Sequence, residues 1–169
     1  GYREAISQAL ATVDPEQLLE ASYDINVTAG LKGRIFVGGN GGSASISDHL
    51  TCDLLKGCFS DKGLQPRVHS LVGSIGLHTA IANDLGYEKT LSFQLEAYGL
   101  ANEDLLILIS SSGNSPNIIE AAKYAHSKEC LVIGMTGFDG GELKKLADAS
   151  LHVASNNYGV IEDCHQILM

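Results

Sequence analysis

The sequence predicts an α/β fold of three layers, with a parallel sheet between two layers of helices. Short apolar runs alternate with stretches of helical periodicity, and no internal repeat or interdomain linker interrupts them. This alternation is typical of right-handed βαβ units. With 169 residues, 44% hydrophobic and 18% charged, the chain is long enough for one domain with a buried core and short for two. We therefore expect a single domain over residues 1–169.

Two helices are expected at the start of the chain. An amphipathic stretch runs through Ala11. The second helix should begin with Asp14 as N-cap and Pro15 at the first helical position, and should continue to about Ala29. Gly33 is expected to end this helical segment, and the first strand follows it directly.

Five short apolar runs are expected to form the sheet. They are residues 34–38, 68–71, 105–109, 131–135 and 151–153. Helical patterns at 115–126 and 142–147 separate the later runs, and a last apolar helical pattern is still running at Met169, where we expect the C-terminal helix to be truncated. Together these elements predict a three-layer αβα sandwich with a flavodoxin-like five-stranded parallel sheet. In such sheets ligands bind beyond the carboxyl ends of the strands.

The charge and the cysteines limit the classes of partner. The formal net charge is −9, from 20 acidic and 11 basic residues without a Lys/Arg cluster, which argues against a nucleic-acid-binding face. No signal peptide or bilayer-spanning apolar run is present, so no membrane partner is expected. The four cysteines show no CxxC pair, which favours a reducing cytoplasmic location. Any bound phosphate is therefore expected to be held by backbone N–H groups and hydroxyls more than by basic side chains.

The loop after the first strand reads Gly-Gly-Asn-Gly-Gly-Ser-Ala-Ser over residues 38–45. Glycines let backbone N–H groups approach an anion, and the helix that follows points its positive end at that anion. The alternative is a tight turn, in which glycines are needed only for their backbone freedom. A tight turn would account for two glycines but not for all four. No acidic residue closes a second strand about 20 positions on, so no nucleotide cofactor is expected.

A second unusual loop, Ser-Ser-Ser-Gly-Asn-Ser-Pro at residues 110–116, again joins a strand to a helix. Four hydroxyls and the amides at a helix start can cradle a phosphate dianion without positive side chains. Ser115 is expected to cap the helix, with Pro116 in its first turn. The alternative is a simple serine-rich N-cap, which needs only one hydroxyl.

The two loops together resemble the sugar isomerase (SIS) domain, and more specifically its phosphoheptose isomerase branch. The matching strings are Gly-Asn-Gly-Gly-Ser at 39–43 and Ser-Ser-Ser-Gly-Asn-Ser at 110–115, with Thr-Ala-Ile-Ala-Asn-Asp at 79–84, Gln-Leu-Glu-Ala at 94–97 and Ile-Gly-Met-Thr-Gly at 133–137. The resemblance covers essentially the whole chain. It implies a homotetramer with active sites at subunit interfaces, and conversion of sedoheptulose 7-phosphate to an aldoheptose 7-phosphate.

The candidate substrate-binding residues all belong to these two loops. They are Asn40, Gly41, Gly42, Ser43, Ser110, Ser111, Ser112 and Ser115. Their expected ligand is a sugar phosphate.

Aldose–ketose isomerisation also needs an acid and a base, and a group that polarises the carbonyl. His49 and Asp53 stand four residues apart on the helix after the first loop, which puts them on one face. The alternative is that His49 and Asp53 are simply a surface histidine and a neighbouring carboxylate without a catalytic role. The resemblance implies that His49, Asp53 and Glu162 are catalytic and hold a divalent metal, with zinc expected, completed by a histidine just after Met169.

Three positions depart from the family pattern. Asp53 replaces a glutamate, Glu162 replaces a glutamine, and Ser74 lies where many isomerases carry an acidic residue. Since both phosphate loops are intact, phosphosugar binding is predicted more firmly than isomerisation. The alternative function is a non-catalytic phosphosugar sensor or partner-binding regulator, although Asp53 and Glu162 can still move protons. His69, His78, His126 and His152 show no ligand spacing and are expected to be structural.

Overall fold

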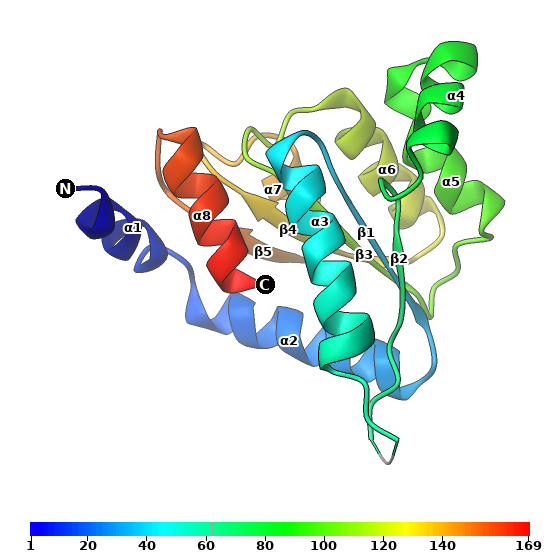
Figure 1. Ribbon diagram of the computed structural model, residues 1–169, viewed down its shortest axis with the longest axis horizontal. Helices are drawn as coiled ribbons and strands as arrows, with labels where there is room; N and C mark the ends of the chain where they lie inside the picture. Colours follow the sequence, from blue (N-terminus) through cyan, green and yellow to red (C-terminus); the bar gives the residue numbers. More distant parts are fainter. Residues whose placement is uncertain (62) are drawn as a thin grey trace.

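A computed structural model of the chain, described for residues 1–61 and 63–169, contains one five-stranded parallel sheet in the order β2-β1-β3-β4-β5 (Figure 1). The strands are β1 (Arg34–Gly39), β2 (Arg67–Ser70), β3 (Leu105–Ser110), β4 (Leu131–Thr136) and β5 (Ala149–His152). The helices are α1 (Tyr2–Leu10), α2 (Pro15–Gly30), α3 (Gly42–Cys52), α4 (Ile75–Leu85), α5 (Ser92–Ala97), α6 (Pro116–Ser127), α7 (Leu143–Leu146) and α8 (Tyr158–Leu168). The predicted α/β fold is confirmed.

The expected elements lie within about two residues of their predicted bounds. Asp14 caps α2 by accepting a hydrogen bond from the Glu16 amide, and Pro15 occupies the first helical position. Two helices between β2 and β3, α4 and α5, were not delimited from the sequence. Within residues 1–61 and 63–169, no helix combines the length and apolar character needed to cross a bilayer.

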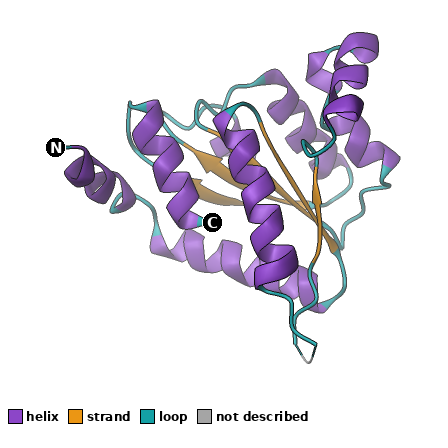
Figure 2. Ribbon diagram, in the orientation of Figure 1, coloured by secondary structure: helices purple, strands orange, loops and turns teal. Residues whose placement is uncertain are grey.

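Helices cover both faces of the sheet (Figure 2). Alternate residues of a strand point to opposite faces, so Ile35 and Val37 enter one core while Phe36 enters the other. The first core is closed by α1, α2, α3 and α8, and the second by α5, α6 and α7. This layering leaves the strand ends free to carry loops.

Arg34 and Asp104 fix β1 and β3 together at their amino ends. The guanidinium lies 2.6 Å from Asp104 Oδ2, and the Arg34 backbone N–H donates to Oδ1 at 2.8 Å. Burial alone would raise the pKa of the Asp104 carboxyl, but hydrogen bonds from Arg34 and from the Ala101 amide outweigh it and hold that pKa below its ordinary value. The carboxylate therefore stays charged and paired. Because this pair joins the amino ends of β1 and β3, it helps to keep their carboxyl ends next to each other.

Candidate functional site: a serine-lined hollow at the ends of β1 and β3

The order of the strands places a crevice at the carboxyl ends of β1 and β3, because the chain leaves β1 toward one edge of the sheet and β3 lies on the other side. A hollow of about 250 Å³ lies there. It is lined by Asn40, Gly41, Gly42, Ser43, Ile109, Ser110, Ser111, Ser112, Ser115, Tyr158 and Glu162. The structure thus brings together all eight predicted substrate-binding residues, from loops about 70 residues apart.

A larger hollow of about 530 Å³ lies elsewhere, between α2, α3 and the end of α8. Its walls are mostly aliphatic, with Leu18, Leu54 and Leu168 among them. Such a surface offers few hydrogen bonds to a phosphate or a sugar. The serine-lined hollow is therefore the better candidate despite its smaller volume.

The glycines of the first loop meet specific steric demands. Gly41 has φ = 55°, a left-handed conformation that favours glycine. A Cβ at Gly42 would lie only 2.5 Å from a carboxylate oxygen of Glu162. Since α3 begins at Gly42, the free N–H groups of its first turn lie at the hollow.

The second loop leaves hydroxyls available to a ligand. Ser110 and Ser112 accept hydrogen bonds from backbone amides of their own loop, at 3.1 and 3.3 Å, so each keeps its O–H donor. The Ser111 hydroxyl is buried and has no hydrogen-bond partner among the described residues. A buried polar group of this kind is a natural donor to a bound anion.

Ser115 does not form the side-chain cap that the sequence predicted. It occupies the N-cap position of α6, but its hydroxyl makes no capping hydrogen bond. The Asn117 side chain accepts from the Ile118 amide instead, at 3.1 Å. Ser115 is thus the N-cap residue, as predicted, but its hydroxyl is not used for capping and remains free to bind a ligand.

The side chain of Asn40 is held by residues that the sequence analysis did not identify. Asn40 and Asn117 exchange two amide hydrogen bonds, at 2.8 and 2.9 Å, and the Tyr87 hydroxyl donates to Asn40 Oδ1 at 2.8 Å. Asn117 is fully buried. Tyr87 follows the matched string at 79–84 and Asn117 follows Pro116, which are weak signals for either role. The network fixes the first loop and leaves one Asn40 N–H for a ligand.

Glu162 reaches the hollow from α8, whose start is capped by Asn157. Its carboxylate forms no hydrogen bond or ion pair with the described part of the chain. It therefore places a negative charge and a proton-accepting group among the serine hydroxyls. Tyr158, one turn earlier on α8, lines the same hollow and was not predicted.

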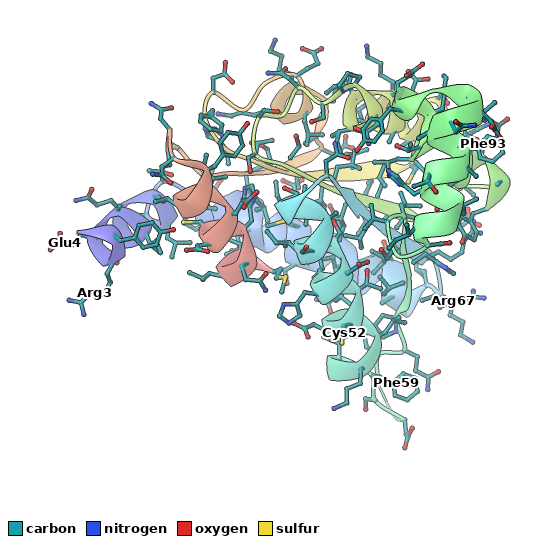
Figure 3. The ribbon with its side chains drawn as sticks, turned by 45° about the horizontal axis from the view of Figure 1, so that its top comes forward. Arg3, Glu4, Cys52, Phe59, Arg67 and Phe93 are labelled. Carbon is teal, nitrogen blue, oxygen red and sulfur yellow. The ribbon has the colours of Figure 1, made fainter. Side chains whose placement is uncertain are left out.

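His49 and Asp53 lie together, as their spacing predicted, with Nε2 3.5 Å from Asp53 Oδ2 and both side chains 55% exposed. Gln166, which the sequence analysis did not identify, donates from Nε2 to Nδ1 of His49 at 2.7 Å. In Figure 3, Cys52 marks the end of α3 that lies away from the hollow.

Glu162 does not join this pair. It packs against Gly42, which precedes His49 by seven residues, or about 10 Å along α3. No group of three or more His, Cys, Asp or Glu side chains able to hold a metal was found in residues 1–61 and 63–169. The expected convergence of His49, Asp53 and Glu162 on one ion is therefore not formed by these residues alone, because α8 lies alongside α3 with Glu162 beside Gly42 and Gln166, one turn later, beside His49.

Comparison with known proteins gives a clear result. The family model of the SIS domain matches residues 1–137. A phosphoheptose isomerase of Helicobacter pylori (strain ATCC 700392 / 26695) is 37% identical over 99% of this chain and 86% of its own length. The chain belongs to the SIS domain family, in its phosphoheptose isomerase branch.

Solved SIS domain structures agree with this assignment. A phosphoheptose isomerase from Francisella tularensis superposes with a TM-score of 0.90 at 31% identity, covering 99% of this chain and 90% of that one. Another from Neisseria gonorrhoeae gives 0.89 at 31% identity, covering 99% and 89%. The predicted family and fold are confirmed.

His165 and Ser74 both form hydrogen bonds that stabilise the fold. His165 is fully buried and donates from Nε2 to the carbonyl of Thr136 at 3.1 Å. Burial lowers the pKa of its imidazole, so the ring stays neutral and ties α8 to the end of β4. Ser74 caps α4 by accepting from the Leu77 amide at 3.3 Å.

Proposed function

We propose that the chain is a sugar phosphate isomerase that converts sedoheptulose 7-phosphate to an aldoheptose 7-phosphate. One observation carries the proposal. A hollow lined by serine hydroxyls and one unpaired carboxylate lies at the carboxyl ends of β1 and β3, in a chain 37% identical to a phosphoheptose isomerase over almost its full length.

The phosphate is held without cationic side chains. Ser111, Ser112 and Ser115 offer hydroxyl donors, and the first turns of α3 and α6 add backbone N–H groups. The field of these helix ends favours a dianion in a protein with a net charge of −9.

The proton transfer is assigned to Glu162, the carboxylate that lines the hollow. A base removes a proton from C1 of the open-chain ketose, the electron pair forms the C1–C2 double bond, and O2 takes a proton. C2 is then protonated and O1 loses its proton, which leaves the aldose. Glu162 lies in the hollow and is the group proposed to serve the carbon atoms. Asp53 and His49 lie about 10 Å farther along α3, so they are proposed as metal ligands and not as groups that move these protons.

A divalent ion such as zinc, if bound, would polarise the carbonyl as a Lewis acid. His49 and Asp53 offer one nitrogen and one oxygen ligand, which suit zinc, but a zinc site needs about four ligands. The described residues do not complete it. We propose that a homotetramer supplies the remaining donors at a subunit interface, and assign no proton transfer to the ion.

We also propose a cytoplasmic location. All four cysteines are free thiols in the structure, with Cys52 and Cys58 exposed and Cys130 and Cys164 buried. Burial raises the pKa of Cys130 to about 12, so that thiol is inert. Exposed unpaired cysteines are typical of a reducing compartment.

The test uses full-length protein incubated with sedoheptulose 7-phosphate, with and without zinc, and detects the aldose product. Calorimetry then compares the wild type with the double variant Ser112→Ala, Ser115→Ala. Loss of hydrogen bonds to a charged group should weaken binding at least about tenfold, whereas Ser127→Ala on the exposed end of α6 should not.

Unchanged affinity in the double variant would refute the phosphate site. Binding without turnover in either metal condition would refute the isomerase and assign the chain to the phosphosugar-sensing alternative.

A further inference from the structure

One peptide group at the end of β4 connects two walls of the serine-lined hollow. The carbonyl of Thr136 accepts a hydrogen bond at 3.1 Å from Nε2 of His165, on α8. The N–H of Gly137, which belongs to the same peptide group, donates to the carbonyl of Ser111 at 2.9 Å. A trans peptide group is planar and rigid, and its C=O and N–H point in opposite directions. The group therefore joins α8, which carries Glu162, to the loop that carries the serines.

The helix α8 can approach this peptide group closely because residue 137 is a glycine. A Cβ at Gly137 would lie 2.5 Å from Cδ1 of Ile161, which is fully buried. Ile161 directly precedes Glu162, and His165 follows Glu162 by three residues, or about one helical turn. Both contacts with the end of β4 thus come from the part of α8 that carries Glu162.

The imidazole of His165 has a single polar contact in the part of the chain that the structure describes. Its Nδ1 is buried without a hydrogen-bond partner. Burial lowers the pKa of the ring, so the ring is neutral and carries one N–H. That proton lies on Nε2, because Nε2 is the nitrogen that faces an acceptor. An unpaired buried nitrogen is unfavourable, and an apolar side chain would avoid it. The hydrogen bond to Thr136 is therefore what the imidazole contributes at this position.

We propose that His165 is a positioning residue, which holds the carboxylate of Glu162 in the serine-lined hollow through its hydrogen bond to the Thr136–Gly137 peptide group. This inference rests on the proposed function, in which the serine hydroxyls bind phosphate and Glu162 moves the protons. The carboxylate and the serine loop are then tied to one rigid group, which sets the distance between the proton acceptor and the bound phosphate. A misplacement of about 1 Å can slow a reaction about 10²-fold.

A double-mutant cycle with Glu162→Gln, in full-length protein, separates positioning from a general loss of stability. His165→Leu removes the N–H donor and should lower kcat on sedoheptulose 7-phosphate at least about tenfold. It should also tighten the binding of inorganic phosphate about twofold, because the negative carboxylate is no longer held beside the serines. In the Glu162→Gln background, His165→Leu should change neither quantity.

Two further variants complete the comparison. His165→Gln can present an N–H close to the place of Nε2, so it should recover most of the lost turnover. Tyr2→Phe is the matched control, because it removes a hydrogen bond of 2.7 Å between α1 and Asp163, the residue next to Glu162, and leaves the end of β4 untouched. It should change neither kcat nor phosphate affinity.

The outcomes separate this inference from the proposed function. Phosphate binding that weakens equally in both backgrounds would mean that His165 only stabilises the fold, and a further loss of turnover in the double variant would refute positioning as well. If the wild type binds phosphate without turnover, the isomerase proposal fails and the phosphate cycle alone decides on His165. If the wild type does not bind phosphate, both proposals fail. Should His165→Leu fail to fold, as judged by thermal unfolding, His165→Asn, whose amide is too short to replace Nε2, takes its place in the cycle.

Discussion

At the scale of single residues, Glu162 is the side chain that most affects the chemistry of the hollow. Its carboxylate lines the same hollow as the serine hydroxyls that are proposed to bind phosphate, and the described residues give it no cationic partner. It must therefore oppose phosphate binding electrostatically while it serves as a proton acceptor. These two effects can be separated by a substitution that removes the charge and keeps the shape.

Glu162→Gln should bind inorganic phosphate several-fold more tightly, by about 1 kcal/mol at low salt, since one repulsive charge is lost. Turnover should fall by about 10²–10⁴-fold, the usual contribution of a general base. Calorimetry at two salt concentrations and a product assay, both with chelator present, measure the two effects. Glu129→Gln, next to the amino end of β4 and so at the opposite edge of the sheet, is the control. Weaker phosphate binding or undiminished turnover in Glu162→Gln would contradict the role given to this carboxylate.

At the scale of elements, the loop between β3 and α6 depends on one glycine. Gly113 has φ = 64°, and a Cβ there would lie 2.0 Å from the carbonyl oxygen of Gly140. Its own carbonyl accepts from the Leu143 amide at 2.9 Å, which joins the serine loop to the start of α7. The position of the serine hydroxyls is thus set by close backbone contact between two loops.

Gly113→Ala should reduce the free energy of unfolding by about 1–3 kcal/mol from left-handed strain alone, and should displace the serine hydroxyls. We expect a lower thermal midpoint together with loss of phosphate binding. Gly30→Ala at the end of α2, where a Cβ meets nothing within 4 Å, should be neutral or slightly stabilising. Intact phosphate affinity in Gly113→Ala would show that the loop tolerates displacement, contrary to this account.

At the scale of the whole molecule, α2 exposes an apolar stripe. Leu19 is 71% exposed and Tyr23 67%, and Val27 and Leu31 continue the four-residue spacing. An apolar stripe of this kind on a helix is usually covered by a partner, and closed symmetric assembly of identical chains is the common form of cover. This stripe supports the proposed homotetramer.

Full-length protein should therefore show the mass of a tetramer by light scattering at micromolar concentration. Leu19→Glu with Tyr23→Glu should give a smaller species that keeps its helical circular dichroism, because two charges in an apolar interface are costly. Asn102→Glu with Ser127→Glu adds the same charge at exposed positions and should leave the mass unchanged. A monomeric wild type would end the proposal.

Much of the fold could be predicted from the sequence because its signals are local. The five apolar runs, the Asp14 and Pro15 helix start, and the glycine and serine strings after β1 and β3 each need only a few neighbouring residues to form. The rule that ligands bind at the carboxyl ends of parallel strands then placed the two loops together. The spacing of His49 and Asp53 likewise placed them on one helix face, where they lie 3.5 Å apart.

Contacts between elements distant in sequence could be known only from the folded molecule. The Asn40–Asn117 pair spans 77 residues and the Gln166–His49 pair 117, and periodicity along one helix says nothing about either. Glu162 meets Gly42 and not His49 because the packing of α8 on α3 sets which turns face each other. Local sequence patterns are thus enough to predict the sheet and the phosphate loops, whereas side-chain packing across the layers determines which groups share a cavity.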